Sequence, residues 1–196
     1  MKKTLLLLSL SSLLMFCKKN NPGVDSSIAS LFPNNIGDNW TYQLASNPSQ
    51  TLLVQIVGNG SLPNGTGVKL WKYTYPTFID SMWVAEVSDT VIFYNTSYTE
   101  QKRLVFPLKV GKIWYTNAVN GDTTKVLEET TTTVPLGQYT DVFEVAKKVG
   151  TVTNFSVNDT LWLEEHIGFV KLSQNEYNLG PEPGNGVWEL TSYNLK

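Results

Sequence analysis

Two glutamates and a histidine stand next to one another in the last quarter of the chain, at Glu164, Glu165 and His166. His166 is the only histidine in the sequence. On a β-strand, Glu164 and His166 would share one face with Trp162, because strand side chains alternate between faces. A carboxylate beside an imidazole can transfer a proton or bind a metal ion. These residues are therefore the candidates for a hydrolytic site.

The remaining residue types argue against catalysis. A zinc site normally needs three or four protein ligands, and there is no second histidine and only one cysteine. A Gly-x-Ser-x-Gly nucleophile motif and a glycine-rich phosphate loop are both missing from the sequence. The adjacent carboxylates Glu128-Glu129 and Glu164-Glu165 would point to opposite faces of a strand, so neither pair can form a glycosidase couple. We expect a protein that is not an enzyme and has no cofactor or metal. A hydrolase using Glu164 and His166 is the less favoured alternative.

The aromatic residues suggest binding instead. The chain has six tryptophans and nine tyrosines. Four tryptophans belong to repeated motifs, and we expect all four in the core: Trp40, Trp83, Trp114 and Trp162. Trp188 follows a glycine- and proline-rich segment that suits an exposed rim. With Tyr73 and Tyr75 it is predicted to line the mouth of an apolar pocket, and such pockets in curved sheets can hold lipid-like ligands.

Cys17, the only cysteine, ends an apolar run that starts at Leu5 and follows two lysines. A charged start, an apolar run and a processing site are typical of an export signal. The run is shorter than the about 20 residues of a permanent transmembrane helix. The arrangement resembles a bacterial lipoprotein signal, in which the cysteine carries acyl chains such as palmitate. Met15 and Phe16 are bulkier than that pattern prefers, so an ordinary cleaved signal and an uncleaved anchor remain alternatives.

The lipoprotein interpretation divides the chain into a signal peptide (1–16), a lipidated cysteine with a flexible tether (17–30) and one domain (31–196). Lys18 follows the cysteine, where an aspartate would favour inner-membrane retention in enterobacteria. The next residues lack the acidic stretch typical of surface-exposed Bacteroidetes lipoproteins. We therefore expect the outer membrane with the domain facing the periplasm, and surface exposure as the alternative.

The charge and composition exclude one class of partner. The formal net charge of −2 argues against nucleic-acid binding, which requires clustered basic residues. The basic pair Lys102-Arg103 is expected at a solvated strand edge. The expected partners are the membrane, through the lipid anchor, and a protein, glycan or lipid-like ligand.

From Leu31 onward the pattern predicts strands only. Runs rich in β-branched and aromatic residues alternate with turn signals that contain glycine, asparagine and proline. The runs are Thr51–Val57, Val68–Tyr75, Thr90–Tyr94, Val142–Val149 and Val187–Leu195. Short connections without crossover helices favour antiparallel pairing. The predicted fold class is all-β.

Three motifs occur twice, in the same order and about 75 residues apart. Phe32-Pro33-x-x-Ile36-Gly37-x-x-Trp40 recurs as Phe106-Pro107-x-x-Val110-Gly111-x-x-Trp114, Leu62-Pro63-x-Gly65 as Val134-Pro135-x-Gly137, and Asp80-Ser81-Met82-Trp83-Val84-x-Glu86 as Asp159-Thr160-Leu161-Trp162-Leu163-x-Glu165. The two repeats, about 31–97 and 105–175, would face each other in an antiparallel sandwich or a curved half-barrel or barrel. Residues 187–195 would add a final strand that closes one edge.

One family shows the same order of motifs. Phe106-Pro107-Leu108-x-x-Gly111-x-x-Trp114-Tyr115, Val134-Pro135-x-Gly137, Val142-Phe143-Glu144-Val145 and Ile167-Gly168-Phe169-Val170-Lys171 follow one another. This resembles the exported TapB-like β proteins and short Bacteroidetes-type lipoproteins, mainly over 105–175. The resemblance implies no catalytic residues. We therefore expect a membrane-anchored binding domain, with a carrier that holds an amphiphile in an apolar cavity between the repeats as the alternative.

Overall fold

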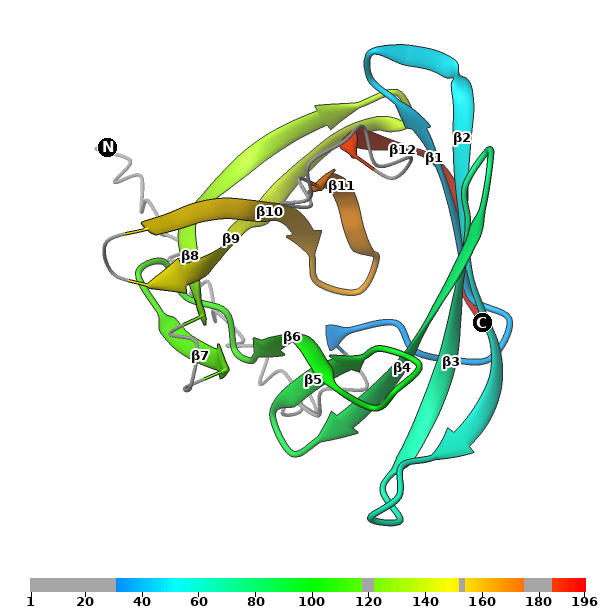
Figure 1. Cartoon of the computed structure of the whole chain (residues 1–196). Helices are drawn as coiled ribbons and strands as arrows, with labels where there is room; N and C mark the ends of the chain where they lie inside the picture. The colour runs from blue at the N-terminus through cyan, green and yellow to red at the C-terminus, as the bar shows by residue number, and fades with distance from the viewer. Residues whose placement is uncertain (1–30, 118–121, 152–153, 175–184) are drawn as a thin grey trace, which may run out of the picture.

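The computed structural model describes residues 31–117, 122–151, 154–174 and 185–196, which form a single antiparallel sheet of 12 strands. The strands are β1 (Asn39–Leu44), β2 (Asn47–Ser61), β3 (Gly67–Thr74), β4 (Ile79–Val87), β5 (Thr90–Tyr94), β6 (Glu100–Val105), β7 (Ile113–Asn117), β8 (Asp122–Val134), β9 (Gly137–Thr151), β10 (Asn154–Glu164), β11 (Gly168–Gln174) and β12 (Gly186–Asn194). The sheet curls into a nearly closed barrel (Figure 1). The predicted all-β, antiparallel class is confirmed.

The strand order is β6-β5-β4-β3-β2-β1-β12-β11-β10-β9-β8-β7. Each half of the chain is a meander of neighbouring strands, and the first and last strands of the chain, β1 and β12, pair at the centre of the sheet. The prediction that residues 187–195 close an edge is therefore wrong. The edges are β6 and β7, which are consecutive in the chain. Sequence patterns identify a strand but do not specify which of its possible neighbours it pairs with.

The repeated Phe-Pro motifs form turns with matching hydrogen bonds. In each turn the backbone N–H of the glycine donates to the carbonyl of a residue on the next long strand. The backbone N–H of that same residue donates to the carbonyl of the residue that follows the glycine. The residues are Gly37, Ile56 and Asp38 in the first turn, and Gly111, Val126 and Lys112 in the second. The donor–acceptor distances are 2.9 and 3.0 Å in both turns. Gly37 and Gly111 have φ values of 99° and 83°, a conformation that glycine adopts without strain.

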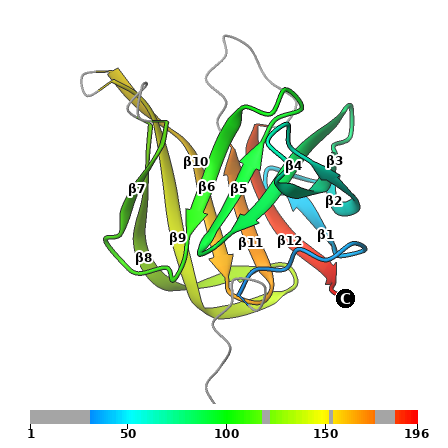
Figure 2. The same cartoon turned by 90° about the horizontal axis from the view of Figure 1, so that it is seen from below.

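The segment before β1 crosses one end of the barrel (blue in Figure 2) and inserts Phe32 into the core. The Phe32 ring stacks on Trp71 with a centroid distance of 5.7 Å and meets Phe169 edge-on, also at 5.7 Å. Trp71 belongs to the first half of the chain and Phe169 to the second. Phe32 therefore joins the apolar faces of the two meanders in one core.

The tryptophans divide differently from the prediction. Trp40 and Trp114 are buried in the core as expected, but Trp83 and Trp162 are only partly buried. Trp83 packs on the smaller cluster of Leu62, Val68 and Ala85, and the Lys171 Nζ lies 4.9 Å from the centroid of the Trp162 ring. A repeated tryptophan can thus be a covered surface residue as well as a core residue.

Lys102 is also placed differently from the prediction. Its residue is 9% exposed, and its Nζ lies 5.0 Å from the centroid of the Phe93 ring and 5.8 Å from that of Phe169. The strand alternation places Lys102 toward the interior and its neighbour Arg103 away from it. Ammonium groups over aromatic faces are attracted by the ring quadrupole. The prediction of a solvated position is therefore wrong for Lys102, whereas Arg103, on the same edge strand, faces away from the core.

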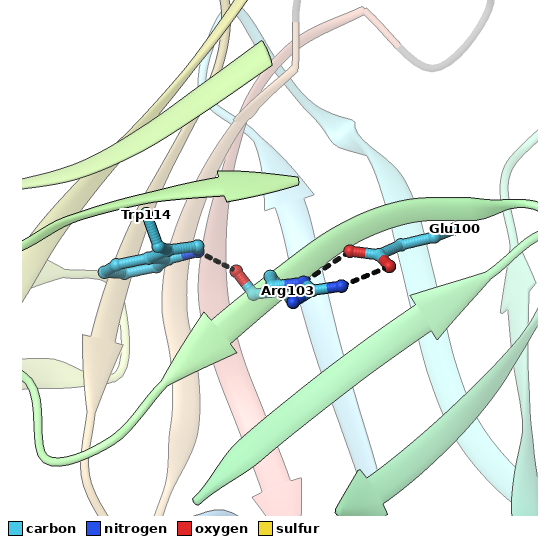
Figure 3. Close-up of polar contacts among 3 residues, drawn as sticks. All are labelled: Glu100, Arg103 and Trp114. Atoms are coloured by element: carbon cyan, nitrogen blue, oxygen red, sulfur yellow. Dashed lines mark hydrogen bonds and ion pairs between the residues drawn. The ribbon is translucent and has the colours of Figure 1, made fainter. Parts of the chain in front are cut away.

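β6 and β7, the two edges of the sheet, approach each other where the barrel comes nearest to closing (Figure 1). Three side chains from the second half of the chain donate to backbone carbonyls of β6: Trp114 Nε1 to Arg103 at 2.9 Å, Lys147 Nζ to Gln101 at 2.6 Å and Lys112 Nζ to Val105 at 2.7 Å. Alternate residues of a strand direct their carbonyls to the same edge. Figure 3 shows the Trp114 bond and the ion pair that Arg103 makes with Glu100. We call the junction of β6 and β7 the seam. Among the described residues, these side-chain hydrogen bonds take the place of a backbone ladder between the two strands.

Candidate functional site

A polar cavity of about 300 Å³ lies against β2, β3 and β4 and the segment that precedes β1. Its walls combine two amides, two opposite charges, two valines and two glycines. The lining residues are Asn34, Asn59, Gly60, Gly67, Val68, Lys69, Val84 and Glu86. This volume is at the lower end of the range for small-molecule sites. The cavity is the candidate binding site.

Asn34 brings the N-terminal segment to the cavity wall. The residue is 9% exposed, and its Oδ1 accepts a hydrogen bond of 2.8 Å from the indole Nε1 of Trp71. This bond fixes the orientation of the amide, because Oδ1 must face the indole. The Asn34 amide also lowers the pKa of the Glu86 carboxyl, so the two side chains lie near each other. Asn34 therefore connects the buried aromatic core to the charged wall of the cavity.

Glu86 and Lys69 supply the two charges. Burial raises the pKa of the Glu86 carboxyl, while the hydrogen bond with Asn34 and the positive charge of Lys69 act in the opposite direction. Lys69 Nζ donates to Asn59 Oδ1 at 2.6 Å. Lys69 and Trp71 alternate along β3, as Glu86 and Val84 do along β4, so both charged side chains emerge from the face that carries the core.

The lining residues offer several kinds of group that a small molecule could contact. The carboxylate and the amide carbonyls accept hydrogen bonds, the ammonium and amide N–H groups donate them, and the valines provide apolar contact. In the sequence, Glu86 stands out only as the repeat counterpart of Glu165. A usable signal was present, because Lys69 and Glu86 lie two residues from buried residues on their strands, in positions where a purely structural wall would be apolar.

The three aromatic residues predicted to line a pocket mouth lie elsewhere and are buried. Tyr73, Tyr75 and Trp188 are 6%, 9% and 0% exposed. Tyr75 meets Trp188 edge-on at a centroid distance of 5.8 Å, and its hydroxyl donates to Gln174 Oε1 at 3.0 Å. Burial raises the pKa of Tyr73 well above its ordinary value, and its hydroxyl has no hydrogen-bond partner among the described residues. A ligand-binding role for these residues stays a prediction.

The Glu164 and His166 pair does not have the expected strand geometry. β10 ends at Glu164, and His166 lies exposed in the following turn with a φ of 77°. Glu164 Oε2 accepts a hydrogen bond of 3.1 Å from the backbone N–H of Ile167, so this carboxylate holds the turn. The expected common face of Trp162, Glu164 and His166 is therefore wrong, because the strand ends two residues before His166. Burial raises the pKa of Glu164.

Two further observations concern metal and membrane. Within the described ranges, no group of three or more His, Cys, Asp or Glu side chains could hold a metal ion. The same part of the chain includes no helix long and apolar enough to span a membrane. Cys17, the predicted lipidation site, lies outside the described residues.

The fold and the cavity define a class: a small all-β, barrel-like protein with a polar pocket beside its N-terminal segment. No known family model and no curated protein matches the chain. A solved structure that resembles it is a "putative lipoprotein from Parabacteroides distasonis ATCC 8503", with 13% identity and a TM-score of 0.39 over 83% of this chain and 97% of that one. A similarity of this size is too low to transfer a role. The TapB-like resemblance stays a prediction.

Proposed function

We propose that this chain is a lipid-anchored envelope protein whose barrel binds a small polar ligand in the cavity beside Glu86. The observation that carries the proposal is that Glu86 and Lys69, two opposite charges, line one cavity on the face of the sheet that carries the core. Both residues are only partly exposed, and withdrawing a charge from water is costly unless it gains a partner. A binding role accounts for both charges, whereas a purely structural wall would use apolar residues there.

The same cavity favours a polar ligand over an amphiphile. A carrier of lipid-like molecules requires an enclosed apolar cavity. The cavity described above has two charged and two amide side chains among its eight lining residues. The carrier and the hydrolase are therefore secondary proposals. The anchor through Cys17 and an outer-membrane position facing the periplasm belong to the main proposal, on the basis of the signal sequence.

Native mass spectrometry of the full-length protein, extracted from the envelope of a Gram-negative host in mild detergent, tests the binding role. Gly67 lines the cavity, and a Cβ added there meets no atom within 4 Å, so Gly67→Trp introduces bulk at the cavity without a backbone clash. Gly58→Trp is the matched control, since Gly58 also has open space but does not line the cavity. We expect a small-molecule adduct in wild type and Gly58→Trp that is absent in Gly67→Trp. Equal adducts in all three, or none in any, contradict the proposal.

Palmitate labelling tests the anchor separately. Cys17→Ser removes the only thiol in the chain, so the label and the membrane association should both be lost. Label retained in the serine variant would contradict lipidation at Cys17.

A further inference from the structure

Building on the proposed binding role, we infer that the ligand is a small zwitterion: a molecule of amino-acid size with one amine and one carboxylate. Each charge of the cavity would then meet the opposite charge of the ligand. The amine would lie at Glu86, and the carboxylate at Lys69.

The first support is that Lys69 and Glu86 do not form an ion pair with each other. Arg103–Glu100 and Lys171–Glu189 are ion pairs among the described residues, and neither includes Lys69 or Glu86. Lys69 Nζ donates to the neutral amide of Asn59 instead, and the neutral amide near Glu86 is that of Asn34, which lowers the pKa of the Glu86 carboxyl. Both charges thus remain available to the cavity. A pair intended only to hold β3 and β4 together would be in direct contact.

The second support is the spacing between the charges. In the ladder of β3 and β4, Lys69 lies opposite Val84, so Glu86 is its diagonal neighbour two residues further on. Diagonal positions of an antiparallel pair are about 7–8 Å apart. Continuing this register places Gly67 opposite Glu86, and Gly67 has no side chain to fill the space. A small molecule can therefore lie between the charges and contact both.

The third support is that the cavity wall lacks aromatic side chains. None of the eight lining residues is aromatic. Sugar rings in protein sites usually stack their apolar faces on aromatic side chains, whereas the apolar side chain that shares the face of Lys69 and Glu86 in this cavity is that of Val84. Two opposite charges with a small aliphatic floor suit an amino acid with a short apolar side chain.

Isothermal titration of the full-length protein in detergent can test this inference with three probes of similar size. L-Alanine carries both charges, L-lactate lacks the amine, and L-alaninamide lacks the carboxylate. We expect alanine to bind at least about tenfold more tightly than either analogue, because each charge-assisted hydrogen bond contributes that order of affinity. Glu86→Gln should remove the preference over lactate, and Lys69→Met should remove the preference over alaninamide. Thermal unfolding confirms that both variants are folded.

The outcomes separate the two proposals. If the adduct is lost in Gly67→Trp but the three probes bind alike, or alanine does not bind, the cavity is a binding site for another class and the zwitterion is overturned. If no adduct is found and none of the probes binds, both proposals fail. If alanine is preferred but neither charge variant changes that preference, the inference is also overturned, since the selectivity then arises elsewhere.

Discussion

At the scale of single residues, Asn34 links core packing to the candidate site. It is a buried polar residue in the segment before β1; it accepts a hydrogen bond from Trp71 and lowers the pKa of Glu86. Buried polar groups are retained where every partner is satisfied, because an orphaned group is costly. The position of Asn34 depends on contacts with strands much later in the chain. The local sequence Phe32-Pro33-Asn34 therefore does not predict it.

Asn34→Ala should destabilise the protein by about 1–3 kcal/mol, because the buried N–H of Trp71 loses its acceptor. Chemical denaturation of Asn34→Ala, Trp71→Phe and the double variant measures the coupling. Trp71→Phe removes the donor, so the cost of Asn34→Ala should be smaller in that background. Strictly additive costs would show that the hydrogen bond contributes nothing to stability.

Glu86 gives a pH-dependent prediction. Burial raises the pKa of its carboxyl, so the folded state binds the proton more tightly than the unfolded state. The resulting stabilisation is present below the unfolded pKa and is lost as the pH rises through the folded pKa. Relative to wild type, Glu86→Gln should therefore be more stable at about pH 8 than at about pH 4.

The comparison for this prediction is Glu129→Gln, which removes one negative charge from an exposed position on β8. Unfolding free energies from urea titrations at the two pH values give the difference. A relative stability of Glu86→Gln that does not change with pH, or that changes as in Glu129→Gln, would show that the burial of Glu86 is not coupled to folding.

At the scale of elements, the repeated turn is the part that the sequence predicted best. The spacing of proline, glycine and tryptophan in the two motifs corresponds to the same backbone hydrogen bonds, because these residue types act through local φ preference and missing donors. The strand runs were also predictable from alternation. Pairing partners were not, since the β1 and β12 ladder joins residues at opposite ends of the sequence.

Gly37→Ala and Gly111→Ala should each lower the free energy of unfolding by about 1–2 kcal/mol, because both positions have a positive φ that an L-residue adopts with strain. Gly37→Ala should cost at least as much, since its Cβ would meet the Lys196 side chain at 3.3 Å. Gly58→Ala is the control, at a position with open space and no positive φ. Equal effects at all three glycines in urea denaturation would refute the argument from backbone strain.

The seam between β6 and β7 leads to a prediction about local stability. Trp114→Phe removes the bond to the Arg103 carbonyl and should speed amide hydrogen exchange in β6 and β7. Trp40→Phe is its repeat counterpart and loses an equivalent bond of 2.7 Å to the Ile167 carbonyl, away from the seam. Both variants lose similar ring volume. Faster exchange at the seam in Trp40→Phe as well would mean that Trp114 has no specific closing role.

At the scale of the whole molecule, the order of the strands determines which connection can be cut. β6 and β7 are neighbours in the chain, yet side chains rather than a ladder join them, whereas β1 and β12 share a ladder from Asn39 to Leu44. Phe32 adds contacts that cross between the halves. The covalent link between β6 and β7 should therefore be dispensable once the barrel has folded.

A protease site inserted after Val110, which is 56% exposed in the loop before β7, tests this expectation. The protein should fold, be cut, and then elute as one species in size-exclusion chromatography, with the two fragments separating only in denaturant. After the cut, the two fragments separate when the protein unfolds, and this separation adds entropy to the unfolded state. The midpoint of thermal unfolding should therefore fall and become dependent on protein concentration. The uncut insertion variant is the control for the insertion itself. Separation of the halves in native buffer would mean that the central ladder and the shared core are too weak to hold the barrel, and that the seam connection is essential to it.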